Sequence, residues 1–145
     1  MEIYTIGFTK KTAEEFFESL RRAGIKRVID VRLNNKSQLA SFTKRDNIEY
    51  LLKELCGADY LHMPELSPTK DILDDYQKKK ITWEEYEKQF GALLNERRIE
   101  ETVDKHLFDM PAVLLCSEPE PDHCHRRLVA EYLRGKWGDV DVTHL

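Results

Sequence analysis

The side chains best suited to chemistry lie close together near the end of the sequence. Between residues 114 and 130 there are two cysteines, two histidines and two arginines, with several carboxylates among them. Asp122 is the expected N-cap of a helix beginning near His123, so Cys124 would lie in the first helical turn. There the free backbone N–H groups and the helix dipole stabilise negative charge, beside the cation of Arg126. The segment therefore predicts a site for a reactive thiolate or a bound anion.

The two cysteines of this segment leave four interpretations open. As a nucleophile, Cys124 has the helix terminus that favours a thiolate, whereas Cys116 ends an expected strand, a usual place for an attacking residue. As zinc ligands, the two thiolates would act with His123 or His125 and with His62. They could also form a disulfide or redox pair, or pack as ordinary core residues. We expect no cofactor, with zinc as the alternative.

The site prediction separates residues that do chemistry from residues that bind the substrate. The predicted catalytic residues are the two thiols and two groups that could move protons, Cys116, Cys124, Glu118 and His125. The predicted substrate-binding residues are Asp30, Arg32, Ser37, His62 and Arg126. The guanidinium group of Arg32 suits a phosphate or carboxylate, although an internal ion pair with Asp30 would explain the same two residues.

Strands and helices alternate along the sequence that must position these residues. The expected strands are Glu2 to Ile6, Arg27 to Val31, Asp59 to Met63, Ala112 to Leu115 and Asp141 to His144. Capping boxes at Thr12 and Thr82 indicate helix starts, another helix spans Ile48 to Cys56, and residues 71–105 are largely helical. This order predicts an α/β fold, a three-layer α/β/α arrangement with a mostly parallel central sheet of four or five strands. At 145 residues the chain is expected to be a single α/β domain, residues 1–145.

Four expected loops follow the carboxyl ends of the strands. They are Gly7 to Thr9, Arg32 to Ser37, His62 to Pro64 and Cys116 to His125. Because ligands of open α/β sheets bind outside the carboxyl ends of the strands, we expect these loops to converge on one site. The aromatic residues at helical spacing from Trp83 to Phe90 are instead expected to pack in the core.

The composition limits the partners and the compartment. The totals of 27 acidic and 23 basic residues give a net charge of −4, so nucleic-acid binding would need a local basic face. Three cysteines are an odd number for a secreted disulfide framework, and the N-terminus has no signal-peptide pattern, so a cytoplasmic location is expected. No apolar run approaches the roughly 20 residues that cross a bilayer, so no membrane partner is expected.

Five motifs together resemble one known family. They are Thr5-Ile6-Gly7, Asp30-Val31-Arg32 with Ser37 and Phe42 after it, Tyr60 to Pro64, Leu115 to Glu118, and Cys124-His125-Arg126. Over nearly its whole length the sequence resembles the domain-of-unknown-function family 488. The family usually has His-Ser where this chain has Phe8-Thr9. The resemblance implies a compact α/β domain with two cysteines in an active site, and it supplies no reaction.

Two functional hypotheses follow from these observations. In the first, the chain is a cysteine-dependent enzyme, a thiol-dependent hydrolase or transferase, acting on a small anionic substrate such as a nucleotide or nucleic acid. In the second, it is a non-catalytic module, with or without zinc, that binds nucleic acid or protein. The basic residues available for the second hypothesis are Arg21, Arg22, Lys26, Arg27, Lys44 and Arg45. The balanced charge favours the enzyme, and the sequence leaves the reaction and the oligomeric state open.

Overall fold

Five parallel strands form the centre of the protein. The computed structural model describes residues 1–35, 41–118 and 120–145, so the predicted site residue Ser37 lies outside the described residues. The strands are β1 (Glu2–Gly7), β2 (Arg27–Asp30), β3 (Asp59–His62), β4 (Ala112–Cys116) and β5 (Asp141–His144). They are ordered β3-β2-β4-β1-β5, and every neighbouring pair is parallel. The five strands predicted from the sequence are therefore present, with ends that shift by a residue.

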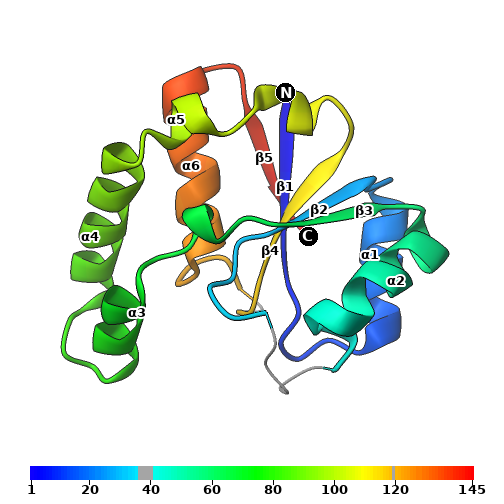
Figure 1. Ribbon diagram of the computed structural model, residues 1–145, viewed down its shortest axis with the longest axis horizontal. Helices are drawn as coiled ribbons and strands as arrows, with labels where there is room; N and C mark the ends of the chain where they lie inside the picture. Colours follow the sequence, from blue (N-terminus) through cyan, green and yellow to red (C-terminus); the bar gives the residue numbers. More distant parts are fainter. Residues whose placement is uncertain (36–40, 119) are drawn as a thin grey trace.

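Helices cover both faces of this sheet. They are α1 (Ala13–Arg22), α2 (Arg45–Cys56), α3 (Lys70–Gln77), α4 (Trp83–Glu96), α5 (Ile99–Thr102) and α6 (His125–Trp137). Helices α1 and α2 lie on one side of the sheet and α3 to α6 on the other (Figure 1). The predicted α/β fold with three layers is confirmed. In the described part of the chain, no helix is long and apolar enough to span a membrane.

Side chains of β4 alternate between the two apolar layers, because successive residues of a strand point to opposite faces. Val113 and Leu115 pack in the layer formed with α1 and α2, whereas Ala112, Leu114 and Cys116 pack in the layer formed with α4 and α6. All five residues are buried. The strand therefore presents the Cys116 thiol to the side of the sheet on which α6 begins.

Local sequence signals explain most helix ends. Thr12 and Glu15 form the predicted capping box of α1, with each side chain bonded to the other's backbone N–H at 3.1 Å. The Thr82 hydroxyl caps α4 by accepting from the Glu85 N–H at 3.1 Å. Helix α2 ends at Gly57, whose left-handed conformation (φ 61°) suits glycine.

The predicted start of the last helix is wrong by two residues. Helix α6 begins at His125, with Cys124 as its N-cap and no side chain capping it, so Asp122 does not have the predicted role. The Cys124 N–H instead bonds to the Pro121 carbonyl at 3.2 Å, which closes a turn over residues 121–124, and Cys124 itself has extended backbone angles. Cys124 therefore lies at the helix terminus and not within the first turn.

The chain connections create a crevice at the carboxyl end of β4. Strands β1 and β2 continue into α1 and α2 on one face of the sheet, whereas β4, which lies between them, continues into α6 on the other face. Ligands of open parallel sheets bind where neighbouring connections diverge in this way. The residue at this position of β4 is Cys116.

Candidate functional site

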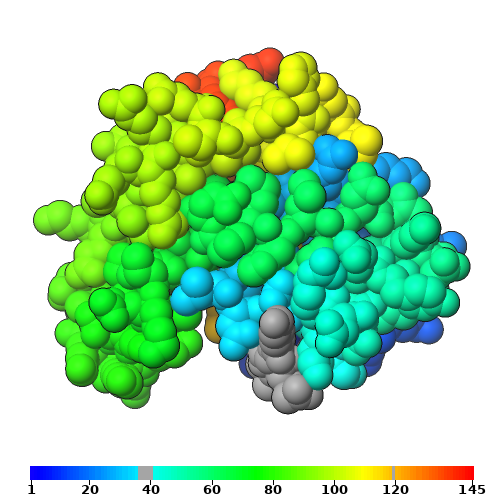
Figure 2. Space-filling model, in the orientation of Figure 1, coloured from blue at the N-terminus to red at the C-terminus, as the bar shows by residue number. Residues whose placement is uncertain are grey.

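A cavity of about 580 Å³ opens at the carboxyl end of β4. Its walls come from the segment after β2, from α3 and the start of α4, and from the residues between β4 and α6. In Figure 2 the surface is notched between the green atoms of the α3 region and the light-blue atoms of the segment after β2. Cys116, Cys124 and His125 all line this cavity, so the predicted thiol site is hollow on one side.

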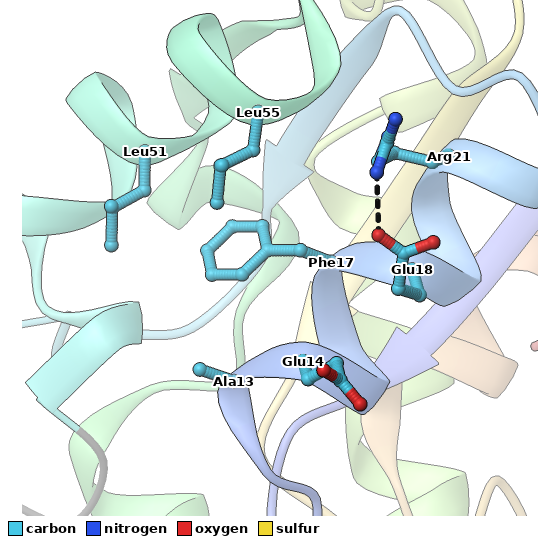
Figure 3. Close-up of a pocket in the computed structure, with 7 residues that line it drawn as sticks. All are labelled: Ala13, Glu14, Phe17, Glu18, Arg21, Leu51 and Leu55. Atoms are coloured by element: carbon cyan, nitrogen blue, oxygen red, sulfur yellow. Dashed lines mark hydrogen bonds and ion pairs between the residues drawn. The ribbon is translucent and has the colours of Figure 1, made fainter.

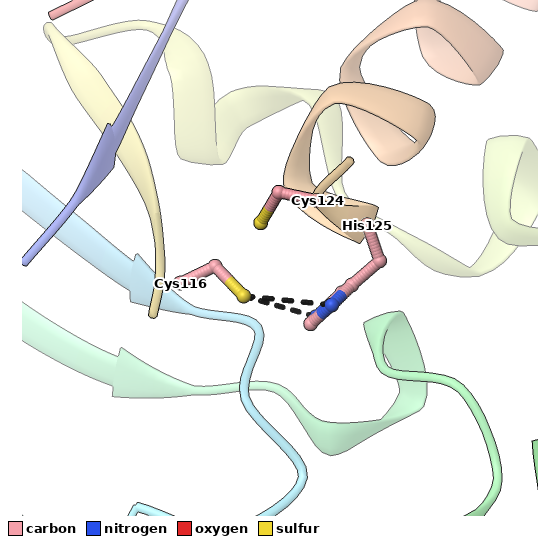
Figure 4. Close-up of side chains that lie close together, drawn as sticks. All are labelled: Cys116, Cys124 and His125. Atoms are coloured by element: carbon pink, nitrogen blue, oxygen red, sulfur yellow. Dashed lines mark hydrogen bonds between the residues drawn. The ribbon is translucent and has the colours of Figure 1, made fainter. Parts of the chain in front are cut away.

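Cys116 and His125 form a thiol–imidazole pair. The Sγ atom of Cys116 lies 3.4 Å from Nδ1 of His125 and 3.7 Å from Nε2 (Figure 4). Nε2 is also 2.6 Å from the backbone carbonyl oxygen of Val31, an acceptor, so Nε2 carries the hydrogen of a neutral ring. The lone pair is then on Nδ1. Because the two ring nitrogens lie at nearly equal distances from Sγ, the sulfur lies over the ring, beside the axis of that lone pair. Nδ1 can accept the proton of Cys116 when the thiol or the ring turns toward it.

Cys124 supplies a second thiol to the same group. Its Sγ, the Cys116 Sγ and a ring nitrogen of His125 all lie within 4.8 Å of one another. Only 4% of Cys116 and 2% of Cys124 is exposed, and both are free cysteines. Figure 4 shows Cys116 coming from the end of β4, and Cys124 and His125 from the start of α6. The end of β4 and the start of α6 therefore meet at the two sulfur atoms.

The two thiols differ in acidity. Burial alone would raise the pKa of Cys116, but hydrogen bonds from the Cys124 thiol and the Ser117 N–H, together with the charge of Arg126, lower it below its ordinary value. The pKa of Cys124 is raised, because its proton is held in the bond to Cys116 and because it is buried. Cys116 is therefore the more acidic thiol of the pair, and Cys124 donates a hydrogen bond to it.

Arg126 fixes the loop that follows β4. Its side chain is fully buried, its Nε donates to the Thr5 hydroxyl at 3.3 Å, and its Nη1 donates to the Glu118 carbonyl. Gly7 lies beside this contact, where a Cβ atom would come within 1.6 Å of the Glu118 carbonyl oxygen. The guanidinium group thus adds positive charge near Cys116 while it is held by protein groups.

Arg32 is likewise held by protein groups. It forms a two-pronged ion pair with Asp30, with Nε and Nη2 at 2.8 and 2.7 Å from the carboxylate oxygens, and Nη2 also donates to the Thr43 carbonyl at 2.6 Å. Burial alone would lower the pKa of Arg32, but Asp30 raises it above its ordinary value. The Tyr60 hydroxyl donates to the same carboxylate at 2.5 Å. This geometry matches the internal pair left open by the sequence, although Arg32 still lines the cavity.

The remaining predicted residues lie at different distances from the thiols. Glu118 lines the cavity and is exposed, and its backbone carbonyl is the group that contacts Arg126. His62 is half-buried and its Nε2 lies 2.7 Å from the Arg32 carbonyl oxygen. Among the described lining residues of the cavity, neither His62 nor Asp30 occurs. Of the four loops expected to converge, those after β2 and β4 line the cavity, whereas residues 7–9 and 62–64 are absent from its described lining. His62 supports the loop after β2, and Gly7 lies beside the loop after β4.

The search among known proteins gives one result. A family model described as Domain of unknown function DUF488 matches residues 12–133. The chain belongs to this family. No match was found among the curated proteins or the solved structures that were searched. The matched region of the DUF488 chain includes Cys116, Cys124, His125 and the cavity wall from α3 and α4.

One wall of the DUF488 cavity is aromatic, which sequence reasoning missed. The Trp83 ring stacks on both Tyr86 and His123, with ring centroids 4.9 Å apart in each pair, and Tyr76 contacts Trp83 edge-on at 5.5 Å. All four rings line the cavity. The helical spacing of Trp83 and Tyr86 correctly predicts that their rings pack within the protein. His123 is next to Cys124 in the sequence and stacks on Trp83, so it was the one residue that could have indicated that these rings line the cavity.

A metal ion would find three donors in this DUF488 site. Among the described residues, the Sγ atoms of Cys116 and Cys124 and a ring nitrogen of His125 form a group of suitable size, whereas His62 and His123 do not belong to it. Two sulfurs and one nitrogen suit a soft or borderline cation such as Zn²⁺, and the cavity leaves room for a fourth ligand.

The candidate basic surface of the DUF488 chain is largely paired within the protein. Arg21 contacts Glu18 at 2.6 Å, and Arg45 contacts Glu49 at 3.3 Å. A second hollow, of about 270 Å³, lies between α1 and α2 and is lined mainly by apolar side chains such as Phe17. Figure 3 shows the Phe17 ring directed toward leucines of α2, with the Arg21 ion pair at one side. The described residues that line this hollow include no cysteine, serine, threonine or histidine.

Proposed function

We propose that this protein is a cysteine-dependent enzyme in which Cys116 is the nucleophile and His125 its base. The observation that carries the proposal is the 3.4 Å contact between Cys116 Sγ and His125 Nδ1, with Nε2 turned to the Val31 carbonyl. This arrangement fixes both the ring orientation and the tautomer. A thiol, a neutral imidazole and a third group that orients the imidazole are the parts of an activated cysteine.

The proposed first step transfers the Cys116 proton to His125 Nδ1 as the sulfur attacks. The thiolate is supported by the Cys124 thiol and the Ser117 N–H, and by the nearby charge of Arg126. Attack is directed into the cavity, since this is the open side of the sulfur. His125 can then return the proton to a leaving group, which is the sequence of a thiol-dependent hydrolase or transferase.

The proposed substrate is small and anionic, with a planar group as its apolar part. The cavity volume of about 580 Å³ suits a single small molecule. Since Arg32 and Arg126 are engaged by buried internal partners, an anionic group would meet the uncapped N-terminus of α6, and on the rim the exposed Lys70, which forms an ion pair with Asp74 at 3.4 Å. The wall near Trp83 would face a planar group. A nucleotide combines both features. The free thiols of Cys116 and Cys124 are consistent with the reducing cytoplasm predicted from the sequence.

Selective alkylation tests the proposal. Native protein is treated with limiting iodoacetamide at neutral pH, and the modified residue is located by mass spectrometry. We expect Cys116 to react first, and we expect Cys116→Ser to leave only slow reaction at the other two thiols. Cys56→Ser is the matched control, because Cys56 is half-buried away from the cavity and its pKa is raised by burial. If all thiols stay inert until denaturation, the proposal fails.

A zinc site is the second candidate, and one observation favours it. A ligating histidine usually donates its other ring N–H to a backbone carbonyl or carboxylate, as His125 does to Val31. Metal analysis of protein purified without chelators separates the candidates. One zinc per chain, with Cys116 alkylated only after chelation, would support the metal site over the free thiolate.

A further inference from the structure

The second thiol is not needed for the proposed first step, although it lies against the nucleophile. A base and an orienting carbonyl already serve Cys116, and the Ser117 N–H and Arg126 already lower its pKa. A buried serine or water would donate the remaining hydrogen bond equally well. Cys124 is nevertheless a thiol, is 2% exposed and shares the cavity with Cys116. A second thiol beside the nucleophile therefore suggests a role in which its sulfur atom itself reacts.

We propose that Cys124 is a resolving thiol and that the substrate of the site is a low-molecular-weight disulfide. This inference rests on the proposed function, because Cys116 must first act as the nucleophile. It keeps the nucleophile and the base of that proposal and replaces hydrolysis or transfer on a nucleotide by thiol–disulfide exchange.

The backbone around the two thiols suits the formation of a disulfide between them. Cys116 is the last residue of β4 and is paired in register with Gly7. The carbonyl of the next residue, Ser117, accepts from the Thr9 N–H at 3.0 Å. Cys124 is the N-cap of α6 and has extended backbone angles; its N–H bonds to the Pro121 carbonyl, and its carbonyl accepts from the Arg127 N–H, each at 3.2 Å. One sulfur therefore lies at the end of the sheet and the other at the start of the helix, on the same cavity. The sulfur atoms start within 4.8 Å of each other and must approach to about 2.05 Å in the bond.

The reaction balances with the groups present. Cys116 attacks one sulfur of R–S–S–R as its proton passes to His125 Nδ1, forming a Cys116–S–S–R mixed disulfide, and His125 gives this proton to the departing sulfur, which leaves as RSH. Cys124 then attacks Cys116 Sγ, its proton passes through His125 Nδ1 to the second departing sulfur, and the second RSH leaves. Two protein thiols become one disulfide as one small disulfide becomes two thiols. A small dithiol returns the protein to its starting state by the reverse exchange.

The cavity favours a small disulfide over a disulfide exposed on a protein. Both thiols are nearly fully buried and reach solvent through a cavity of about 580 Å³. Its aromatic wall at Trp83 and Tyr76 suits the apolar body of such a molecule, and sulfur contacts aromatic rings favourably. A folded protein presenting a disulfide could not bring its sulfur to the floor of this cavity.

Counting the released thiol tests this inference with 4,4′-dithiodipyridine as the probe. The Cys56→Ser protein, treated first with chelator, should release two equivalents of thiopyridone per chain and lose the mass of two hydrogens, with no adduct retained. Adding Cys124→Ser should reduce the release to one equivalent and leave one adduct on Cys116. Adding Cys116→Ser instead should abolish release under native conditions, and denaturant should restore the reaction of Cys124 in that variant.

The outcomes separate the two proposals. An adduct that persists on Cys116 of the Cys56→Ser protein, with one equivalent released, overturns the resolving role and leaves the nucleophile intact. Two adducts with no internal disulfide overturn it as well. No release before denaturation overturns both proposals. Stopped-flow release from the Cys56→Ser protein gives a further check, because resolution requires two phases with the mixed disulfide as a transient species.

Discussion

Replacing Gly7 by alanine should disturb the loop that serves the nucleophile. Gly7 pairs with Cys116 across β1 and β4, and an added Cβ would lie 1.6 Å from the Glu118 carbonyl oxygen and 2.8 Å from Nη1 of Arg126. Separations below 3.0 Å essentially never occur for a Cβ atom, so the carbonyl must move away. That carbonyl belongs to backbone and accepts from the buried Arg126, so it cannot move without loosening this bond.

The cost follows from two contributions. Overpacking a buried position costs roughly 1–3 kcal/mol. Loosening a hydrogen bond from a charged donor costs up to about 3 kcal/mol. Since the loop relaxes partly, we expect Gly7→Ala to lower the free energy of unfolding by roughly 2–4 kcal/mol. We also expect slower alkylation of Cys116, because the Ser117 N–H that supports its thiolate adjoins the displaced carbonyl.

Urea unfolding and iodoacetamide kinetics measure these two effects. Gly91→Ala in α4 and Gly135→Ala in α6 are matched controls, because a Cβ at either position meets nothing within 4 Å. Alanine within a helix should stabilise the protein by roughly 0.5–1 kcal/mol. A Gly7→Ala protein as stable as these controls, with unchanged Cys116 reactivity, would refute the role assigned to this close approach.

Three further predictions address the thiols and the buried ion pair. Because the pKa of Cys116 is lowered and that of Cys56 is raised by burial, the alkylation rate of Cys116 should rise with pH at lower values than that of Cys56, as mass spectrometry across a pH series can show. His125→Gln should slow Cys116 alkylation at neutral pH by about 10²-fold, and a smaller loss in rate at high pH would confirm a base over a packing role. Asp30→Asn breaks a buried pair and should cost roughly 3–5 kcal/mol in urea unfolding, whereas Asp59→Asn, which breaks an exposed pair at 3.4 Å, should cost less than about 1 kcal/mol. Equal costs for these two substitutions would contradict the burial argument.

Signals confined to a few neighbouring residues were sufficient for much of the fold. The Thr12–Glu15 capping box and the glycine after α2 fix helix ends by local hydrogen bonds and backbone angles. Strands alternating with helices imply parallel pairing, and parallel pairing brings the carboxyl-end loops together. The proximity of Cys116 and Cys124 follows from this topology, although they are separated by a loop of irregular structure.

The unpredicted features depend on contacts between distant residues. Whether Arg32 binds a ligand or Asp30 depends on Thr43, whose carbonyl accepts a hydrogen bond from Nη2, the same nitrogen that donates to Asp30. The start of α6 depends on a turn at Pro121 that competes with the N-cap preference of Asp122. Neither competition is visible in residue types alone, because the decisive partner acts through backbone geometry.

The arrangement assigns chemistry and recognition to different parts of the chain. The thiols and their base come from β4 and the start of α6, and they are fixed by backbone groups of the neighbouring strands and loops. The cavity wall comes from α3 and α4, which lie between β3 and β4 in the sequence and pack on the opposite side of the site. Arg32 and Arg126 both bond to groups of the protein. Their guanidinium groups therefore hold the loops in place, and the charge of Arg126 lowers the pKa of Cys116. Under the proposed function, discrimination between substrates arises from the α3 and α4 wall, where Tyr76 and Trp83 line the cavity but do not belong to the group of two thiols and an imidazole.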